Sequence, residues 1–139
     1  MKERIDQIKK LLDQHWQNNG LIIEHLADRF ARIRRSPSGS NDLRPGGTVS
    51  GPFMMSMVDT ALYVAILSET GLQEMAVTTN ININFLAKPK ANTDVIAECR
   101  LIKVGRKLVV GEVNLYSDDE SQVIAHATGT YSLPSQSHK

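Results

Sequence analysis

One apolar segment, residues 52–67 in the stretch GPFMMSMVDTALYVAIL, constrains the fold of this chain more than any other feature. Pro52 stands where a helix can begin, because the first turn does not need its missing N–H, and Gly71 marks the region where that helix ends. A helix that is apolar nearly all round must be covered on most sides, so this segment predicts a buried central helix. A membrane-spanning helix needs about 20 apolar residues, and this shorter run carries Asp59 at its centre, so we expect no membrane partner.

Alternation with a period of two predicts strands in the second half of the chain. Within residues 77–85 we expect the odd-numbered side chains on one face and the even-numbered ones, including Thr78, on the other. Three further strands are expected at about 93–104, 107–117 and 122–132. The links between these four strands are short, which predicts an antiparallel meander in chain order.

The sequence of the first half of the chain predicts one helix and one strand. Apolar side chains at helical spacing indicate an amphipathic helix over residues 3–16, and residues 29–35 resemble a strand. The predicted fold is therefore α+β: an N-terminal helix within 1–20, then an antiparallel sheet curled around one long helix. We expect a single domain over residues 1–139, with a flexible tail at 134–139.

The charge balance and the single cysteine bear on the partners and the cellular setting of the protein. The chain of 139 residues has 16 basic and 15 acidic residues, which gives no strong field for nucleic acid. The first ten residues lack the apolar core of a secretory signal, and the single cysteine excludes an internal disulfide. We therefore predict a cytoplasmic protein, with neither nucleic acid nor membrane among its partners.

The carboxylate of Asp59 is the strongest candidate for chemistry. Burial of an unpaired carboxylate is costly, so some compensation is expected. Ser56, Asp59, Thr60 and Tyr63 have the spacing of one narrow polar stripe along the helix. The stripe could face a crevice or a subunit boundary; alternatively, Asp59 caps a neighbouring turn or pairs with a buried arginine.

The glycine-rich loop before the helix offers a second candidate. The Gly51 amide lies at the predicted N-terminus, where an N–H aided by the helix dipole can bind an oxyanion. Gly51 and Asp59 are about 12 Å apart along a helix axis, so both could contact one substrate only if two chains contribute. Glycines in such a loop are equally compatible with ordinary turn formation.

Four segments, GGTVSG…MVDTALYVA, VTTNININFL, VGRKLVVGEV and VIAHATGTY, resemble the acyl-CoA thioesterases of the hotdog fold, in particular the phenylacetate-degradation (PaaI-like) group. The resemblance covers about residues 43–133. It implies hydrolysis of coenzyme A thioesters at sites between two subunits, in homodimers that often form tetramers. Coenzyme A is then part of the substrate, and no separate cofactor or metal is expected.

The resemblance also implies roles for individual residues. Asp59 matches the general base or nucleophile, Gly51 the amide that binds the carbonyl oxygen, and Thr78 a residue that helps to position water. The family's usual His-Gly-Gly is here Ser50-Gly51-Pro52, and Arg44 replaces a common asparagine. The residues expected to contact substrate are Ser50, Arg44, Thr60 and Tyr63, with Arg106 and Lys107 for the phosphates of coenzyme A.

Three alternatives to a thioesterase remain open from the sequence. A hotdog protein that lacks the family histidine could bind acyl-CoA or an acyl chain without hydrolysing it. A hydratase or dehydratase would pair a carboxylate with a histidine, and no histidine lies in the central helix or the loop before it. The third alternative is a structural oligomer. The sequence leaves the preferred acyl group undetermined.

Overall fold

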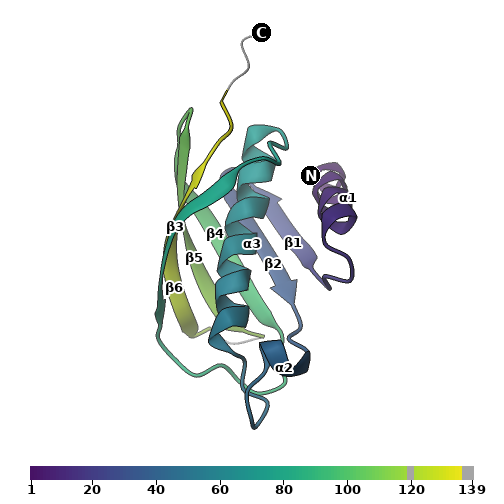
Figure 1. Ribbon diagram of the computed structural model, residues 1–139, viewed down its shortest axis with the longest axis vertical. Helices are drawn as coiled ribbons and strands as arrows, with labels where there is room; N and C mark the ends of the chain where they lie inside the picture. The colour runs from purple at the N-terminus through teal and green to yellow at the C-terminus, as the bar shows by residue number, and fades with distance from the viewer. Residues whose placement is uncertain (119–120, 136–139) are drawn as a thin grey trace.

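The computed structural model describes residues 1–118 and 121–135, so residues 136–139 of the tail expected at 134–139 lie outside the described part. Figure 1 shows one long helix lying across the concave face of a curved sheet, with a second helix beside it. The elements are α1 (Lys2–His15), β1 (Ile22–Ala27), β2 (Phe30–Arg35), α2 (Gly39–Asp42), α3 (Gly51–Thr70), β3 (Val77–Phe85), β4 (Val95–Val104), β5 (Leu108–Ser117) and β6 (Val123–Ser132).

The sheet has six strands in the order β1-β2-β4-β5-β6-β3, and every neighbouring pair is antiparallel. Helix α3 packs against its concave face, and α1 adds an N-terminal helix next to α3 and β1 (Figure 1). This confirms the predicted α+β hotdog arrangement, in which a long central helix is wrapped by a curved antiparallel sheet.

The position of β3 corrects the predicted meander. Strand β3 does not pair with β4, which follows it in the chain, but lies at the sheet edge and pairs with β6. The connection is not a hairpin turn: the Leu86 and Ala87 N–H groups donate to the Ile124 carbonyl at 2.8 and 3.1 Å, and the Asn92 N–H donates to the Gly47 carbonyl at 3.3 Å. The link of residues 86–94 between β3 and β4 therefore passes beneath the N-terminus of α3 (Figure 1). Although this link is short, the two strands that it joins are not neighbours in the sheet.

A second correction concerns the N-terminal half, where the structure has a β1–β2 hairpin instead of one strand. The chain reverses at Asp28 and Arg29, and Arg29 adopts a positive φ of 56°. The ladder is irregular between Ile23 and His25, so the buried residues Ile23 and Leu26 lie three positions apart. This bulge removes the alternation that would have indicated a strand.

Helix α3 begins and ends where the sequence predicts. The Ser50 hydroxyl accepts a hydrogen bond from the Phe53 N–H at 3.2 Å, and Gly71 ends the helix in the left-handed conformation with φ 72°. Leu62 packs so closely against the sheet that a Cβ on Gly129 would lie 2.5 Å from its Cδ1 atom. Among the described residues, α3 is long and apolar enough to cross a membrane, but its burial against the sheet is an ordinary reason for that composition.

Two arginines of β2, Arg32 and Arg34, form ion pairs on the outer face of the sheet. Arg34 lies 2.6 Å from Glu24, 3.1 Å from Asp94 and 2.8 Å from Asp118. Burial works against ionisation of Glu24, but hydrogen bonds from Arg34 and Arg32 outweigh it and hold its pKa below the ordinary value. The pKa of Asp94 is lowered by hydrogen bonds from Ser36 and Arg34. These arginines are therefore neutralised within the fold.

Replacing Arg34 with methionine is expected to lower the free energy of unfolding near pH 7 by about 1–2 kcal/mol, because three carboxylates lose a partly buried partner. The folded-state pKa values of Glu24 and Asp94 lie below their ordinary values of 4.5 and 3.8, so the stabilisation is fully present above those ordinary values and is lost as the pH falls from them through the lower folded-state values. The acid-induced loss of stability, measured by urea unfolding across this range, should be shallower in Arg34→Met than in the wild type. Lys103→Met, which removes an exposed charge, is the control, and an equally steep loss in Arg34→Met would contradict the assignment.

Candidate active site

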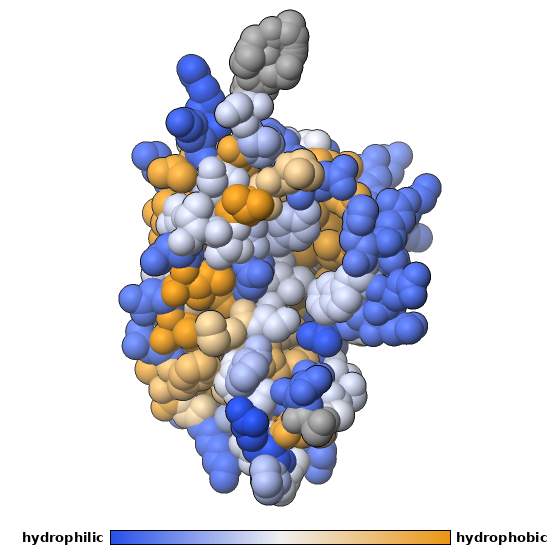
Figure 2. Space-filling model, in the orientation of Figure 1, coloured by the Kyte–Doolittle hydropathy of each residue, from blue (hydrophilic) through white to orange (hydrophobic). Residues whose placement is uncertain are grey.

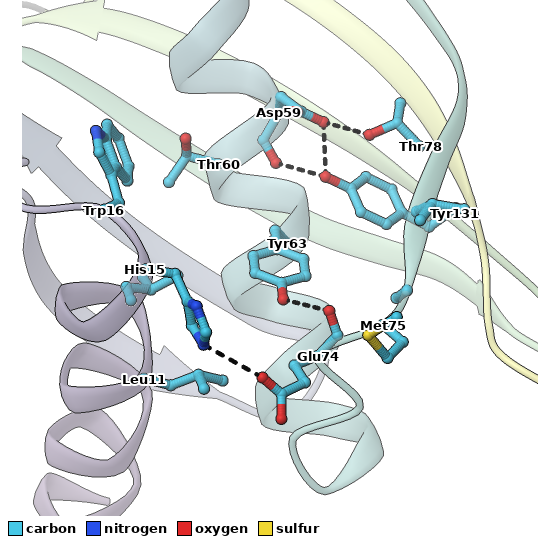
Figure 3. Close-up of a pocket in the computed structure, with 13 residues that line it drawn as sticks. Leu11, His15, Trp16, Asp59, Thr60, Tyr63, Glu74, Met75, Thr78 and Tyr131 are labelled. Carbon is cyan, nitrogen blue, oxygen red and sulfur yellow. Dashed lines mark hydrogen bonds and ion pairs between the residues drawn. The ribbon is translucent and has the colours of Figure 1, made fainter.

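The polar stripe of α3 faces a crevice. Asp59, Thr60 and Tyr63 are partly exposed along one side of α3. They line a cavity of about 540 Å³ between α1 on one side and the start of β3 on the other (Figure 3). The residues that line the cavity are Leu11, Leu12, His15, Trp16, Asp59, Thr60, Tyr63, Glu74, Met75, Ala76, Val77, Thr78 and Tyr131.

Two hydroxyl groups hold one oxygen of the Asp59 carboxylate. Thr78 donates to Oδ1 at 2.7 Å and Tyr131 donates to the same atom at 2.6 Å (Figure 3). Asp59 forms no ion pair with any arginine among the described residues, so hydroxyls rather than a buried cation compensate it. The second oxygen, Oδ2, accepts no hydrogen bond from the described part of the chain. The carboxylate of this cavity-lining residue is thus fixed through one oxygen, while the other is left without a hydrogen bond from the described residues.

A bulge in β3 brings Thr78 to this position. The predicted alternation placed Thr78 on the opposite face from Ile81, and this is wrong. Thr78 pairs with Tyr131 and Ile81 pairs with Gly129, and the register shifts between Thr78 and Asn80. Tyr131 and Gly129 lie on the same face of β6, so Thr78 and Ile81 share the face that contacts α3. One extra residue in the strand therefore aims the Thr78 hydroxyl at Asp59.

Tyr131 is the site residue that the sequence analysis missed. Its side chain is only 3% exposed, and its ring stacks on that of Tyr63 with centroids 6.1 Å apart. Burial, followed by the hydrogen bond to Asp59, raises the pKa of Tyr131 far above its ordinary value, so the phenol remains a donor. The sequence did contain a signal for a buried tyrosine at this position. Tyr131 shares one strand face with the small residues Ala125, Ala127 and Gly129, and a buried tyrosine needs a hydrogen-bond partner.

Gly51 lies at the N-terminus of α3, about two turns before Asp59 of its own chain. Its N–H, at the first position of the helix, donates to no acceptor among the described residues, and a Cβ at this position would lie 3.7 Å from the Phe85 ring. The neighbouring Ser50 is buried, and its hydroxyl caps the helix while donating to the Asn41 carbonyl at 2.9 Å. The free N–H is available to bind an oxygen, whereas the Ser50 hydroxyl is already engaged.

The basic residues expected at the substrate lie in two places. Arg44 is exposed in the turn before α3, near the Gly51 end. Arg106 and Lys107 are exposed in the β4–β5 turn, and the register puts Leu108, which follows them, opposite Ser132, the partner of Val77. Arg106 and Lys107 therefore lie at the end of the sheet that carries Thr78 and Tyr131. In residues 1–118 and 121–135, no cluster of three histidine, cysteine or acidic side chains could hold a metal ion.

Removing either hydroxyl that holds Asp59 is expected to reduce catalysis. Hydrogen bonds to charged groups contribute about 1.5–3 kcal/mol, so Thr78→Val and Tyr131→Phe should each lower kcat for the thioester hydrolysis that the family resemblance implies by about tenfold or more, with little change in KM. Thr78→Ser, which keeps the hydroxyl, is the matched control and should retain most of the wild-type rate. Equal loss in Thr78→Ser and Thr78→Val would show that the hydroxyl is not what matters.

The chain is similar in sequence and fold to known thioesterases. The model of the thioesterase superfamily matches residues 46–124, which include Gly51, Asp59 and Thr78. A candidate thioesterase from Silicibacter sp. TM1040 is 35% identical, with 94% of this chain and 92% of that chain covered and a TM-score of 0.84. No curated protein matches the chain in sequence.

Two more distant structures share the fold. The PaaI protein of the E. coli phenylacetic acid degradation operon is 18% identical, with 96% of this chain and 93% of that chain covered and a TM-score of 0.79. Zebra fish thioesterase superfamily member 2 is also 18% identical, with coverage of 94% and 98% and a TM-score of 0.79. The resemblance to the PaaI-like group thus holds at the level of the fold. From the family model and the 35% identical relative, the chain belongs to the thioesterase superfamily.

Proposed function

We propose that this protein hydrolyses acyl-CoA thioesters, with Asp59 as the general base or nucleophile. The observation that carries the proposal is the state of its carboxylate: Thr78 and Tyr131 hold Oδ1, Oδ2 accepts no hydrogen bond from the described residues, and Asp59 lines the cavity. A carboxylate fixed in this way is oriented for reaction without being neutralised by a cation.

The chemistry needs only water and the thioester. As a base, Asp59 takes a proton from water while the water oxygen attacks the thioester carbon. The carbon–sulfur bond then breaks, coenzyme A leaves as a thiolate that takes up the proton, and the acyl group becomes a carboxylic acid. As a nucleophile, Asp59 would first form a mixed anhydride, which water then hydrolyses to the same products. Both routes place negative charge on the carbonyl oxygen, and this charge requires a donor.

We assign that donor to the Gly51 N–H of a second copy of the chain. Strand β3 is an edge strand whose free side has no partner among the described residues, and unpaired edges readily pair with another chain. Its side chains are largely exposed, and Figure 2 shows apolar surface over this part of the molecule, where Met75, Val77, Phe85 and Leu86 are at least half exposed. A homodimer formed through β3 would cover this surface.

The two ends of β3 support the same assembly. Thr78, at one end, contacts Asp59, whereas Phe85, at the other end, lies beside Gly51. Antiparallel pairing of two β3 strands about a two-fold axis sets the Thr78 end of one chain against the Phe85 end of its partner. Asp59 of one chain would then approach the partner's Gly51. Arg106 and Lys107 lie at the same end of the sheet as Thr78, where they could bind the phosphates of coenzyme A.

The experiment that tests this proposal is the release of free thiol from a panel of acyl-CoA substrates, from acetyl to decanoyl and including phenylacetyl. We expect turnover that depends on Asp59. If no thioester is hydrolysed but acyl-CoA raises the melting temperature, the protein is instead the non-catalytic acyl-CoA binder that the missing family histidine allows.

A further inference from the structure

Helix α1 forms one wall of the cavity that contains Asp59, and the family match does not include it. Leu11, Leu12, His15 and Trp16 line the cavity from α1, whereas the matched segment begins at residue 46. Gly51, Asp59 and Thr78 lie in the segment that the family model matches, whereas the wall facing Asp59 comes from outside it. A wall of this kind can determine which substrates fit without taking part in the chemistry.

The character of the cavity indicates an apolar ligand. Leu11, Trp16 and Met75 present apolar side chains across the floor formed by α3 (Figure 3). The main polar groups are already engaged: Tyr63 donates to the Glu74 carbonyl at 2.6 Å, and the Thr78 and Tyr131 hydroxyls donate to Asp59. A polar chain such as pantetheine would find few free partners here, whereas a hydrocarbon or aryl group would gain contact area.

The wall is also held firmly in place. The Arg35 guanidinium lies between the Trp16 and Phe53 rings, 4.9 Å from each centroid, and its Nε donates to the Asn19 carbonyl at 2.9 Å. Ile8 and Leu12 anchor α1 in the core. At the far end from Asp59, His15 Nε2 lies 3.6 Å from Glu74 Oε1 and spans the cavity from α1 to the loop before β3 (Figure 3). Trp16 and Leu11 are thus fixed surfaces.

We propose that this cavity is the acyl pocket and that Leu11 and Trp16 on α1 determine the acyl groups accepted, favouring apolar chains or rings well beyond acetyl in size. The proposal rests on the proposed function for the position of the thioester at Asp59. An acyl group whose carbonyl lies at Asp59 extends over Thr60 and Tyr63 towards Trp16 and Leu11. The exposed His15–Glu74 pair lies at the far end of this path.

Binding of thioethers, which cannot be hydrolysed, tests the pocket separately from catalysis. Trp16 is the single tryptophan of the chain, so its fluorescence reports directly on this wall. We expect S-octyl-coenzyme A to change the emission of the wild-type protein and S-ethyl-coenzyme A to change it little. Leu11→Trp should fill the pocket. In calorimetric titrations, its affinity for S-octyl-coenzyme A should fall by about tenfold or more relative to its affinity for S-ethyl-coenzyme A.

Lys10→Trp is the matched control, because Lys10 is exposed on the same helix and does not line the cavity. It should leave the ratio of the two affinities unchanged. Two results together would overturn the acyl pocket even if thioesters are hydrolysed. These are no change in Trp16 emission when S-octyl-coenzyme A is added, and no change in the ratio of the affinities for the two thioethers in Leu11→Trp. A Trp16 response without any thioester hydrolysis would support the pocket and remove the proposed catalytic function. If Leu11→Trp does not fold, the wild-type emission alone decides.

Discussion

Replacing Asp59 with asparagine is expected to lower kcat for acyl-CoA hydrolysis by about 10²- to 10⁴-fold, the range that a positioned acid–base group contributes. The asparagine can neither accept a proton from water nor attack the thioester. Its side-chain oxygen can still accept the hydrogen bonds from Thr78 and Tyr131, so the fold should be preserved. The measurement is free-thiol release at saturating substrate, with the melting temperature recorded for both proteins.

Ser56→Ala provides the control for this substitution. Ser56 lies on the same stripe of α3, one turn before Asp59, but does not line the cavity. Its rate should stay within a few-fold of the wild type. Turnover by Asp59→Asn at a rate close to that of the wild type would exclude Asp59 as base or nucleophile, whatever the identity of the acyl group.

Gly51→Pro is expected to lower kcat by about 10²- to 10³-fold, as removal of an oxyanion donor does in other enzymes. Proline deletes the N–H at the first position of α3, where helices tolerate it, and the extended Ser50 backbone with ψ 155° suits a following proline. Gly51→Ala keeps the N–H, and its Cβ would meet the Phe85 ring at the ordinary contact distance of 3.7 Å. Alanine should therefore retain activity and melting temperature.

Co-expression of Asp59→Asn and Gly51→Pro then tests whether the site is shared. If one chain supplies Asp59 and its partner supplies Gly51, each mixed dimer has one intact site, and random pairing should restore about a quarter of wild-type activity. The mixed dimers can be isolated with two different tags and assayed directly. Mixed dimers as inactive as the two parent variants would mean that Asp59 and Gly51 do not act across the interface.

Much of the candidate site could be predicted from local sequence alone. Pro52 and Gly71 defined the limits of α3, because their backbone preferences act within one helical turn. The spacing of Asp59, Thr60 and Tyr63 placed them on one stripe, and the structure confirms that this stripe faces a cavity. The resemblance led to thioesterase membership and to the wrapped-helix fold, both of which are confirmed. The roles of Asp59 and Gly51 and the dimeric site remain predictions.

The tertiary structure decided how distant segments meet. Pairing of β3 with β6 rather than β4 depends on hydrogen bonds between segments far apart in the chain, and the link length did not reveal it. The bulge after Thr78 reverses the faces of Val77 and Thr78 relative to the rest of β3, because one extra residue exchanges the two faces of a strand. Tyr131 reaches Asp59 from 72 positions along the chain, and α1 encloses the cavity from the opposite end of the sequence. Local periodicity can assign a face to a residue, but only the packed sheet determines which side chain that face meets.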